Sequence, residues 1–202
     1  MPPTWQLSVW ITSLAGKYEL LDGVMGMLAS NYFSPALMAL ICLCLWFGTR
    51  DAAQRERSQK TLIHVCVGVL LAFLIVVILN AAQSERGNLW ERPYINHSEA
   101  EKAMNILYWP LSDSSFPSNA ITGLAAAAAG LWSTNKRASL IAWGLVGLWG
   151  LGRVYVGIHY PIDIAGGILI GSVSAFVGLK LMQTIDSVPS SLLRLARRLL
   201  LA

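Results

Sequence analysis

The sequence predicts an all-α protein: a polytopic integral membrane bundle of five to six spans with an interfacial helix near the N-terminus. Three observations favour this class. Hydrophobic residues make up 55% of the 202 residues, charged residues make up only 13%, and the mean hydropathy is positive. A water-soluble globule of this length needs more polar surface than that. We therefore expect a single membrane domain over residues 1–202.

The first apolar segment, residues 5–31, is interrupted by charged residues. Lys17, Glu19 and Asp22 break the run, while leucine, valine and methionine recur at helical spacing around them. This pattern is typical of an amphipathic helix that lies in the membrane interface. A sixth span over the same residues is the alternative.

Five further segments are apolar enough to be membrane helices. A helix needs about 20 apolar residues to cross the hydrocarbon core. Four segments approach that length, and a shorter one, rich in Trp, Leu and Gly, suits a helix packed inside the bundle. The five segments cover approximately residues 33–49, 61–82, 118–134, 138–153 and 160–182. After them, residues 190–201 carry three arginines among leucines, which predicts an amphipathic tail helix on the inner leaflet.

Lysines and arginines set the expected orientation. If five spans alternate, the basic residues between Arg50 and Lys60, those at 136–137 and those of the tail fall on one side, which the positive-inside rule assigns to the cytoplasm. The loop at about 83–117 and the connection at 153–159 then face the periplasm or exterior of a bacterial inner membrane. The basic residues form no continuous stripe, so a nucleic-acid partner is not expected.

Two stretches expected on that outer face suit phosphate binding. Arg92 can hold a phosphate through two hydrogen bonds, and Pro93 stiffens the chain directly after it. In Ser114–Ala120, a Pro-Ser pair precedes a helix whose free backbone N–H groups can bind an anion. Taken alone, neither stretch indicates a function. An exposed arginine is usually just hydrated by water, and a Pro-Ser pair usually just begins a helix.

A third stretch places Arg153, His159 and Asp163 at one membrane boundary. His159 is a candidate nucleophile, and Asp163 lies about one helical turn further, where it can orient the imidazole. A lone histidine near a membrane is usually structural, but three converging ionisable groups at a lipid–water boundary favour a function. Phosphate hydrolysis needs cations on the phosphate oxygens, a nucleophile and a proton donor.

With these three stretches in this order, the chain resembles the type-2 phosphatidic acid phosphatases, membrane enzymes with three motifs on one face of a helical bundle. The resemblance extends from Leu21 to about Met182. Within the family it is strongest to the bacitracin-resistance type of undecaprenyl-diphosphate phosphatase. The matching residues are Leu21-Asp22, Arg92-Pro93-Tyr94, Ser115-Phe116-Pro117-Ser118, Val156-Gly157 and His159-Tyr160-Pro161.

The resemblance implies that His159 forms a phosphohistidine and that Asp163 orients it. Arg92, Arg153 and the Ser118–Asn119 backbone would hold the phosphate of a lipid substrate, foremost undecaprenyl diphosphate, which would become the monophosphate. No metal or other cofactor is expected, because arginines and helix ends supply the positive charge. The expected partners are this lipid phosphate and the membrane lipids, and the oligomeric state is left open.

Three positions depart from the family pattern. Glu85 stands in place of the leading lysine of the first motif, so Arg86 is a provisional substitute, and Gly152 replaces the leading serine of the third motif. Ala120 stands where the second motif ends in the histidine that protonates the leaving group. Loss of a positioned acid costs about 10²- to 10⁴-fold in rate, so a low-activity enzyme is expected. We favour a deliberate replacement of histidine over a natural loss.

Other functions remain open on the sequence. One is a broader phosphatase for phosphatidic acid, phosphatidylglycerol phosphate or lipid A, and another is a lipid phosphotransferase. A non-catalytic phospholipid binder that keeps the arginines is a third. A transporter is disfavoured, because the expected spans contain almost no ionisable residues away from their ends.

Overall fold

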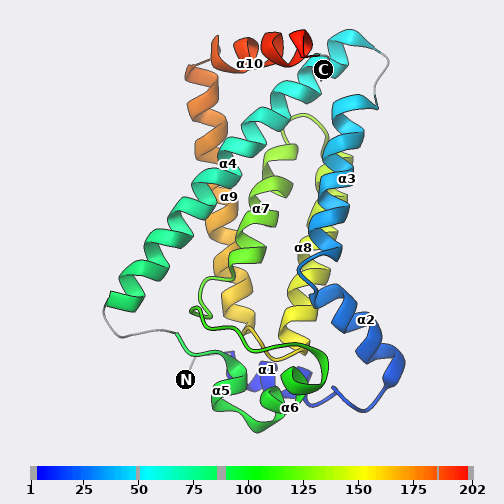
Figure 1. The fold of residues 1–202 in the computed structure, drawn as a ribbon, viewed down its shortest axis with the longest axis vertical. Helices are drawn as coiled ribbons and strands as arrows, with labels where there is room; N and C mark the ends of the chain where they lie inside the picture. The colour runs from blue at the N-terminus through cyan, green and yellow to red at the C-terminus, as the bar shows by residue number, and fades with distance from the viewer. Residues whose placement is uncertain (1–3, 49–50, 86–89, 186, 200–202) are drawn as a thin grey trace.

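Every regular element in the described part of the chain is an α-helix, which confirms the all-α prediction (Figure 1). The computed structural model describes residues 4–48, 51–85, 90–185 and 187–199. The helices are α1 Trp5–Thr12, α2 Glu19–Ala29, α3 Phe33–Phe47, α4 Ala52–Glu85, α5 Pro93–Asn96, α6 Ser98–Leu107, α7 Asn119–Leu131, α8 Lys136–Tyr155, α9 Pro161–Thr184 and α10 Ser187–Arg198.

The predicted number of five to six spans is not confirmed. Among the described residues, α4, α8 and α9 are long and apolar enough to cross a membrane, and α2 with α3 makes at most a fourth span, bent by 55°. Helix α7 is apolar but has only 13 residues. At 1.5 Å per residue it is roughly 20 Å long, less than the hydrocarbon core.

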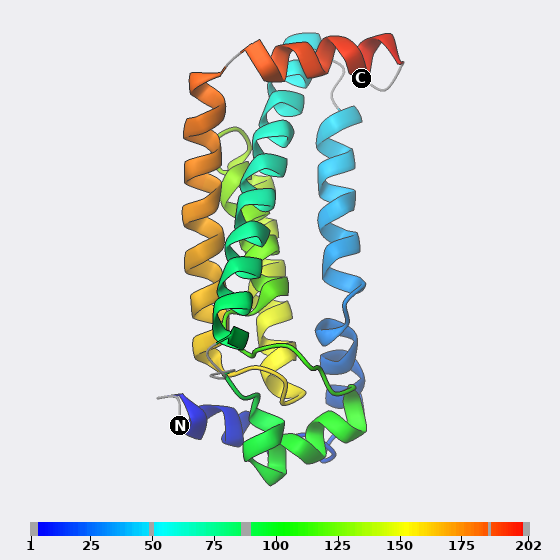
Figure 2. The same cartoon turned by 60° about the vertical axis from the view of Figure 1, so that its left-hand side comes forward.

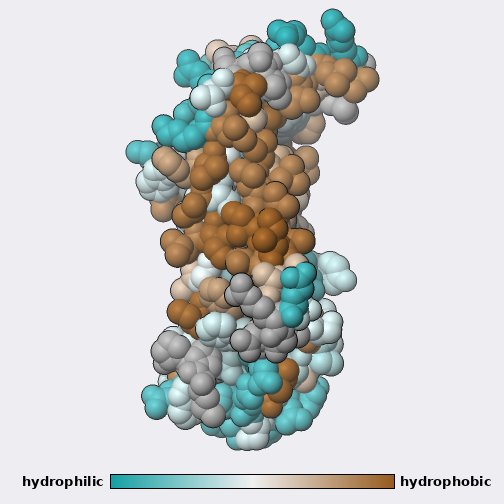
Figure 3. Space-filling model, turned by 90° about the vertical axis from the view of Figure 1, so that its left-hand side faces the viewer, coloured by the Kyte–Doolittle hydropathy of each residue, from teal (hydrophilic) through white to brown (hydrophobic). Residues whose placement is uncertain are grey.

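On the face shown in Figure 3, apolar side chains cover the middle of the molecule, and hydrophilic ones gather toward both ends. Large hydrophobic side chains on the long helices point outward, among them Leu70, Val77, Ile141, Leu169 and Phe176, each with more than half of its surface exposed. Soluble proteins rarely expose apolar patches of this extent. The chain is therefore an integral membrane protein.

Helix α7 is the centre of the bundle and brings the site segments together. Nine of its 13 residues are buried, and it packs against α4, α8 and α9. Small residues make the contact with α9 close, since a Cβ on Gly171 would lie 2.3 Å from the carbonyl oxygen of Thr122. This packing sets the first turn of α7 beside the first turn of α9, where the backbone N–H of Ser118 donates to the carbonyl of Asp163 at 3.2 Å.

The N-terminal segment 5–31 is two helices rather than the single amphipathic helix predicted. The chain turns between α1 and α2 at Gly16, whose φ of +79° is in the left-handed region that glycine adopts without strain. The carboxylate of Asp22 accepts a hydrogen bond from the N–H of Gly16, and one from the hydroxyl of Tyr155 at 2.7 Å. These bonds and the packing of α2 on α8 tie the N-terminal segment to the third motif.

The two ends of the bundle differ in composition. The short helices α1, α5 and α6 and the connection from α8 to α9 lie at the lower end in Figures 1 and 2. Helices α5 and α6 belong to the expected 83–117 loop. The opposite end holds the basic starts of α4 and α8 and the amphipathic tail helix, present as α10. There Nη2 of Arg197 lies 3.0 Å from Oε2 of Glu56, which attaches the tail to α4. Arg50 falls outside the described residues.

Candidate functional site

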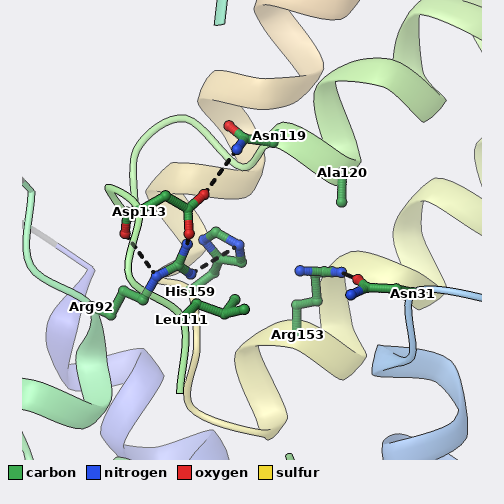
Figure 4. A pocket seen from close by; sticks show the side chains of 8 residues that line it. All are labelled: Asn31, Arg92, Leu111, Asp113, Asn119, Ala120, Arg153 and His159. Carbon is green, nitrogen blue, oxygen red and sulfur yellow. Dashed lines mark hydrogen bonds and ion pairs between the residues drawn. The ribbon is translucent and has the colours of Figure 1, made fainter. Parts of the chain in front are cut away.

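The three predicted stretches meet at the lower end of the bundle around one pocket of about 200 Å³ (Figure 4). Five of the predicted residues line it, and Asn31, Leu111 and Asp113 complete the lining. The predicted residues are Arg92, Asn119, Ala120, Arg153 and His159. Ser118 and Asp163 lie behind them, fully buried. Arg86 falls outside the described residues, so its predicted role remains a prediction.

A sharp turn after α8 brings His159 to the pocket. Gly157 has φ +78°, and a Cβ there would lie 2.4 Å from the carbonyl oxygen of Ala100, so the turn requires glycine. Two residues after His159, Pro161 begins α9 with the φ that a first helical turn needs. The imidazole is thereby held between the ends of two long helices, with only 2% of His159 exposed.

The hydrogen bonds of His159 fix which ring nitrogen faces the pocket. Nδ1 lies 3.0 Å from the carbonyl oxygen of Ser115, and a carbonyl only accepts, so Nδ1 carries the proton. Nε2 then presents its lone pair to the pocket. There it lies 3.2 Å from Oγ of Ser118 and 3.4 Å from Nη1 of Arg92.

Asp163 contacts His159 as predicted, but it is not the nearest acceptor. Its Oδ2 lies 3.5 Å from Nδ1 of His159, and it accepts stronger bonds from Oγ of Ser115 at 2.5 Å and from the N–H of Tyr160 at 2.7 Å. The carboxylate is therefore linked to the imidazole also through Ser115, whose carbonyl accepts a hydrogen bond from Nδ1–H. The sequence analysis expected Asp163 beside His159, and it included Ser115 only as part of a matching motif, without a role.

The pKa of His159 is lowered to about 4, mainly by burial and also by the positive charges of Arg92 and Arg153. The hydrogen bond and the negative charge of Asp163 act in the opposite direction without reversing the shift. At neutral pH the imidazole is uncharged. A neutral ring with an unprotonated Nε2 is the form that can act as a nucleophile.

Arg92 lies directly before α5, because Pro93 occupies the first position of that helix, and it is 2% exposed. Its Nη1 donates to the carbonyl of Ile158 at 2.8 Å, which fixes the guanidinium beside the histidine. Its Nη2 lies 2.8 Å from Oδ1 of Asp113, whose Oδ2 accepts from Nδ2 of Asn119 at 2.9 Å. Asp113, which the sequence analysis did not identify, thus binds two residues that were predicted to hold the phosphate.

Arg153 reaches the pocket from the last turn of α8. It is 4% exposed, and its guanidinium carbon lies 4.9 Å from the ring centroid of Trp149. Nη2 donates to Oδ1 of Asn31, which lies between α2 and α3, while the buried Nε has no hydrogen-bond partner. The sequence analysis did not identify Asn31 as a site residue either.

The side chain at position 120 offers no proton. Ala120 is the second residue of α7 and lines the pocket. His97, the nearest histidine along the outer loop, stacks on Trp5 at 5.6 Å between ring centroids and contacts Tyr160 at 6.1 Å. It is not among the residues that line the pocket. The structure therefore does not place it as a substitute acid.

Ala120 also belongs to a second, apolar groove of about 520 Å³ between α3, α4 and α7. Met38, Phe73 and Trp149 are among the side chains that line this groove. Because Ala120 lines both cavities, the polar pocket and the apolar groove adjoin at this residue. The arrangement can place an anionic head group beside His159 and an apolar chain between the helices.

Comparison with known proteins gives a family and a shared fold. The PAP2 superfamily model matches residues 62–186. Undecaprenyl-diphosphatase BcrC of Bacillus subtilis (strain 168) is 25% identical over 170 residues, which are 83% of this chain and 78% of that protein.

Two solved structures have a similar fold. Aquifex aeolicus LpxE has a TM-score of 0.59 at 23% identity, covering 89% of this chain and 96% of its own. A transmembrane PAP2-type phosphatidylglycerolphosphate phosphatase from Bacillus subtilis has a TM-score of 0.54 at 21% identity, covering 89% and 86%. At these identities the likeness concerns the fold.

Proposed function

The chain belongs to the PAP2 superfamily, and from this premise we propose that it removes a phosphate from a membrane lipid phosphate or diphosphate, foremost undecaprenyl diphosphate. One observation carries the proposal: the unprotonated Nε2 of a neutral His159 faces the same pocket as the guanidinium groups of Arg92 and Arg153. The 25% identity to BcrC supports the diphosphate, and the groove beside Ala120 supports a lipid substrate.

The proposed reaction has two displacements at phosphorus. Nε2 of His159 attacks the terminal phosphorus, a P–N bond forms, and the bridging P–O bond breaks so that the lipid monophosphate leaves. Water then attacks the phosphohistidine, the P–N bond breaks and inorganic phosphate departs. Arg92, Arg153 and the first backbone N–H groups of α7, at Asn119 and Ala120, would hold the charged oxygens. The N–H of Ser118, which the sequence analysis included, instead donates to the carbonyl of Asp163.

Ala120 would make this chain a slow enzyme. The first step lacks a positioned acid, which typically costs about 10²- to 10⁴-fold in rate when the leaving oxygen needs a proton. We place the site on the periplasmic or outer face of a bacterial inner membrane. The position of the basic ends of α4, α8 and α10 at the opposite end of the bundle supports this orientation.

Replacing Ala120 with histidine tests the proposal. Phosphate release from undecaprenyl diphosphate is expected to rise by about 10²-fold or more over the unsubstituted chain. Ala120→Gln, which adds similar bulk without an acid of suitable pKa, should give no such rise. Adding His159→Ala to Ala120→His should abolish both turnover and the acid-labile phosphoenzyme. Absence of turnover by Ala120→His on any lipid phosphate would contradict the proposal.

A second candidate function is favoured by Ala120 itself, namely a non-catalytic binder of phospholipids that keeps both arginines. In that case Ala120→His still binds lipid phosphates without hydrolysing them. A panel of phosphatidic acid, phosphatidylglycerol phosphate, lipid A and undecaprenyl diphosphate separates a narrow from a broad phosphatase. Transfer of labelled phosphate to a second lipid would instead identify a phosphotransferase.

A further inference from the structure

We propose that Asn31, together with the edge of the Arg153 guanidinium that it contacts, forms a subsite for the second phosphate of a lipid diphosphate, the phosphate that leaves with the lipid. The inference rests on the proposed phosphatase function and deepens it, because it names diphosphates over monophosphates as the substrate class. Asn31 lies outside residues 62–186, which match the family model, so the family match assigns it no role.

The pocket has two opposite walls (Figure 4). His159 lies on one side with Arg92, at 3.4 Å from its Nη1, while Arg153 and Asn31 face them from the other side. A displacement at phosphorus proceeds with the attacking and leaving atoms roughly in line. A phosphate attacked by Nε2 of His159 therefore directs its leaving oxygen away from the ring, toward Arg153 and Asn31.

Arg153 has a donor that the protein leaves unused. Its side chain is almost completely buried, yet Nε has no hydrogen-bond partner. A buried unpaired donor is costly, the more so on a charged group, and such groups often mark a ligand site. The stacking on Trp149 holds the guanidinium plane in place, and Arg153 lines the pocket.

Asn31 adds a neutral donor at the same wall. Its Oδ1 accepts from Nη2 of Arg153, so the amide is oriented by the arginine. The Nδ2 group of the same amide is then available to donate to a phosphate oxygen. The bend between α2 and α3 places this residue here, and the close approach of α2 to α8 keeps it there: a Cβ on Gly152 would lie 2.8 Å from the backbone N of Ala29.

The chemistry at position 120 agrees with a phosphate leaving group. A lipid alcohol leaves as a strongly basic alkoxide and needs a proton, whereas a phosphate monoester, with a second pKa near 6, leaves as a stable anion. Ala120 gives no proton, but donors at Asn31 and Arg153 would stabilise the negative charge that develops on the leaving phosphate. The pocket of about 200 Å³ has room for several water-sized groups, enough for two linked phosphates.

Two substrates with the same tail test the subsite. We would compare kcat/KM for farnesyl diphosphate and farnesyl monophosphate in the unsubstituted chain and in Asn31→Ala. The expected result is an approximately tenfold loss on the diphosphate and less than a twofold change on the monophosphate. Asn105→Ala, an exposed asparagine of α6, is the matched control and should change neither value. An equal loss on both substrates, or no loss on the diphosphate, would overturn the subsite.

A binding measurement keeps this inference separate from the proposed function. Inorganic pyrophosphate should bind the unsubstituted chain about tenfold more tightly than inorganic phosphate, and Asn31→Ala should reduce that difference below twofold. If pyrophosphate is preferred and no lipid is hydrolysed even by Ala120→His, the phosphatase proposal fails and the subsite stands. If lipid is hydrolysed while the two anions bind equally, the subsite fails and the phosphatase proposal stands.

Discussion

Oδ1 of Asp113 lies 2.8 Å from Nη2 of Arg92, so a carboxylate holds the guanidinium that faces His159. The other carboxylate oxygen accepts a hydrogen bond from Asn119 at 2.9 Å. Both donors are ones that a phosphate in this pocket would use. A bound phosphate must therefore displace Asp113 and overcome its negative charge.

We predict that Asp113→Asn strengthens anion binding. The side chain of Asp113 is 44% exposed, so the ion pair is worth at most about 1 kcal/mol, and its removal should improve the inhibition constant of inorganic phosphate by roughly fivefold. Asp51→Asn, an exposed acid at the opposite end of the bundle, should leave the constant unchanged. Weaker phosphate inhibition in Asp113→Asn would show instead that the carboxylate is needed to position Arg92.

The plot of kcat/KM against pH should lack the fall in activity near pH 6.5 that protonation of an ordinary histidine would cause. Only the neutral imidazole of His159 can attack phosphorus, and burial lowers its pKa to about 4. Activity should consequently persist as the pH falls through 6.5 and decline only near pH 4, once the titration of the substrate phosphate is corrected for. A decline centred at pH 6.5 that disappears with a substrate of different phosphate pKa would be a substrate effect. One that remains would contradict the buried, neutral histidine.

The same shift predicts a loss of stability in acid. Because the folded-state pKa of His159 lies below its unfolded value of 6.5, the unfolded chain binds a proton first as the pH falls from 6.5 toward 4. At about 1.4 kcal/mol per pKa unit, this removes up to about 3 kcal/mol from the free energy of unfolding. Thermal unfolding in detergent at pH 7.5 and pH 4.5 should show a smaller difference for His159→Gln than for the unsubstituted chain.

Ser115 supports the histidine through the buried carboxylate. Its Oγ donates to Oδ2 of Asp163 at 2.5 Å, both side chains are fully buried, and Oδ1 of Asp163 already lacks a partner. Ser115→Ala should therefore cost about 1–3 kcal/mol of folding stability and lower kcat more than it raises KM. Ser112→Ala, three residues earlier and exposed, is the control and should have no effect on either quantity.

The long helices could be predicted from hydropathy, and their polar ends could not. Helices α8 and α9 match the predicted segments within a few residues, because Asn135 caps the first and Pro161 begins the second. Helix α4 extends well beyond the predicted 61–82 at both ends, since its first turns are polar and water-exposed and carry no hydropathy signal. The break at Gly16, whose N–H donates to Asp22 six residues later, was not predicted, because apolar residues at helical spacing continue across it.

Some residues of the candidate site could likewise be predicted from the sequence, and others could not. Arg92, Arg153 and His159 were found because each belongs to a short motif with its own spacing. Asn31 could not be found, because its contact with Arg153 joins residues 122 positions apart and exists only after α2 has packed on α8. Asp113 lies five residues before Ser118, but it was not identified, because the sequence analysis looked for positive charges that could hold a phosphate and an aspartate is negative.

The apolar groove beside Ala120 predicts a dependence on lipid length. Ala39 of α3 lines the groove, whereas Ala36, one turn earlier and also exposed, does not. Tryptophan at position 39 fills the space that a long chain would occupy, at a steric cost of about 1 kcal/mol. Ala39→Trp should therefore raise KM for undecaprenyl diphosphate roughly fivefold and leave KM for farnesyl diphosphate unchanged, while Ala36→Trp should change neither. Equal effects of the two substitutions would mean that the lipid tail lies elsewhere, in the bilayer or along another face of the bundle.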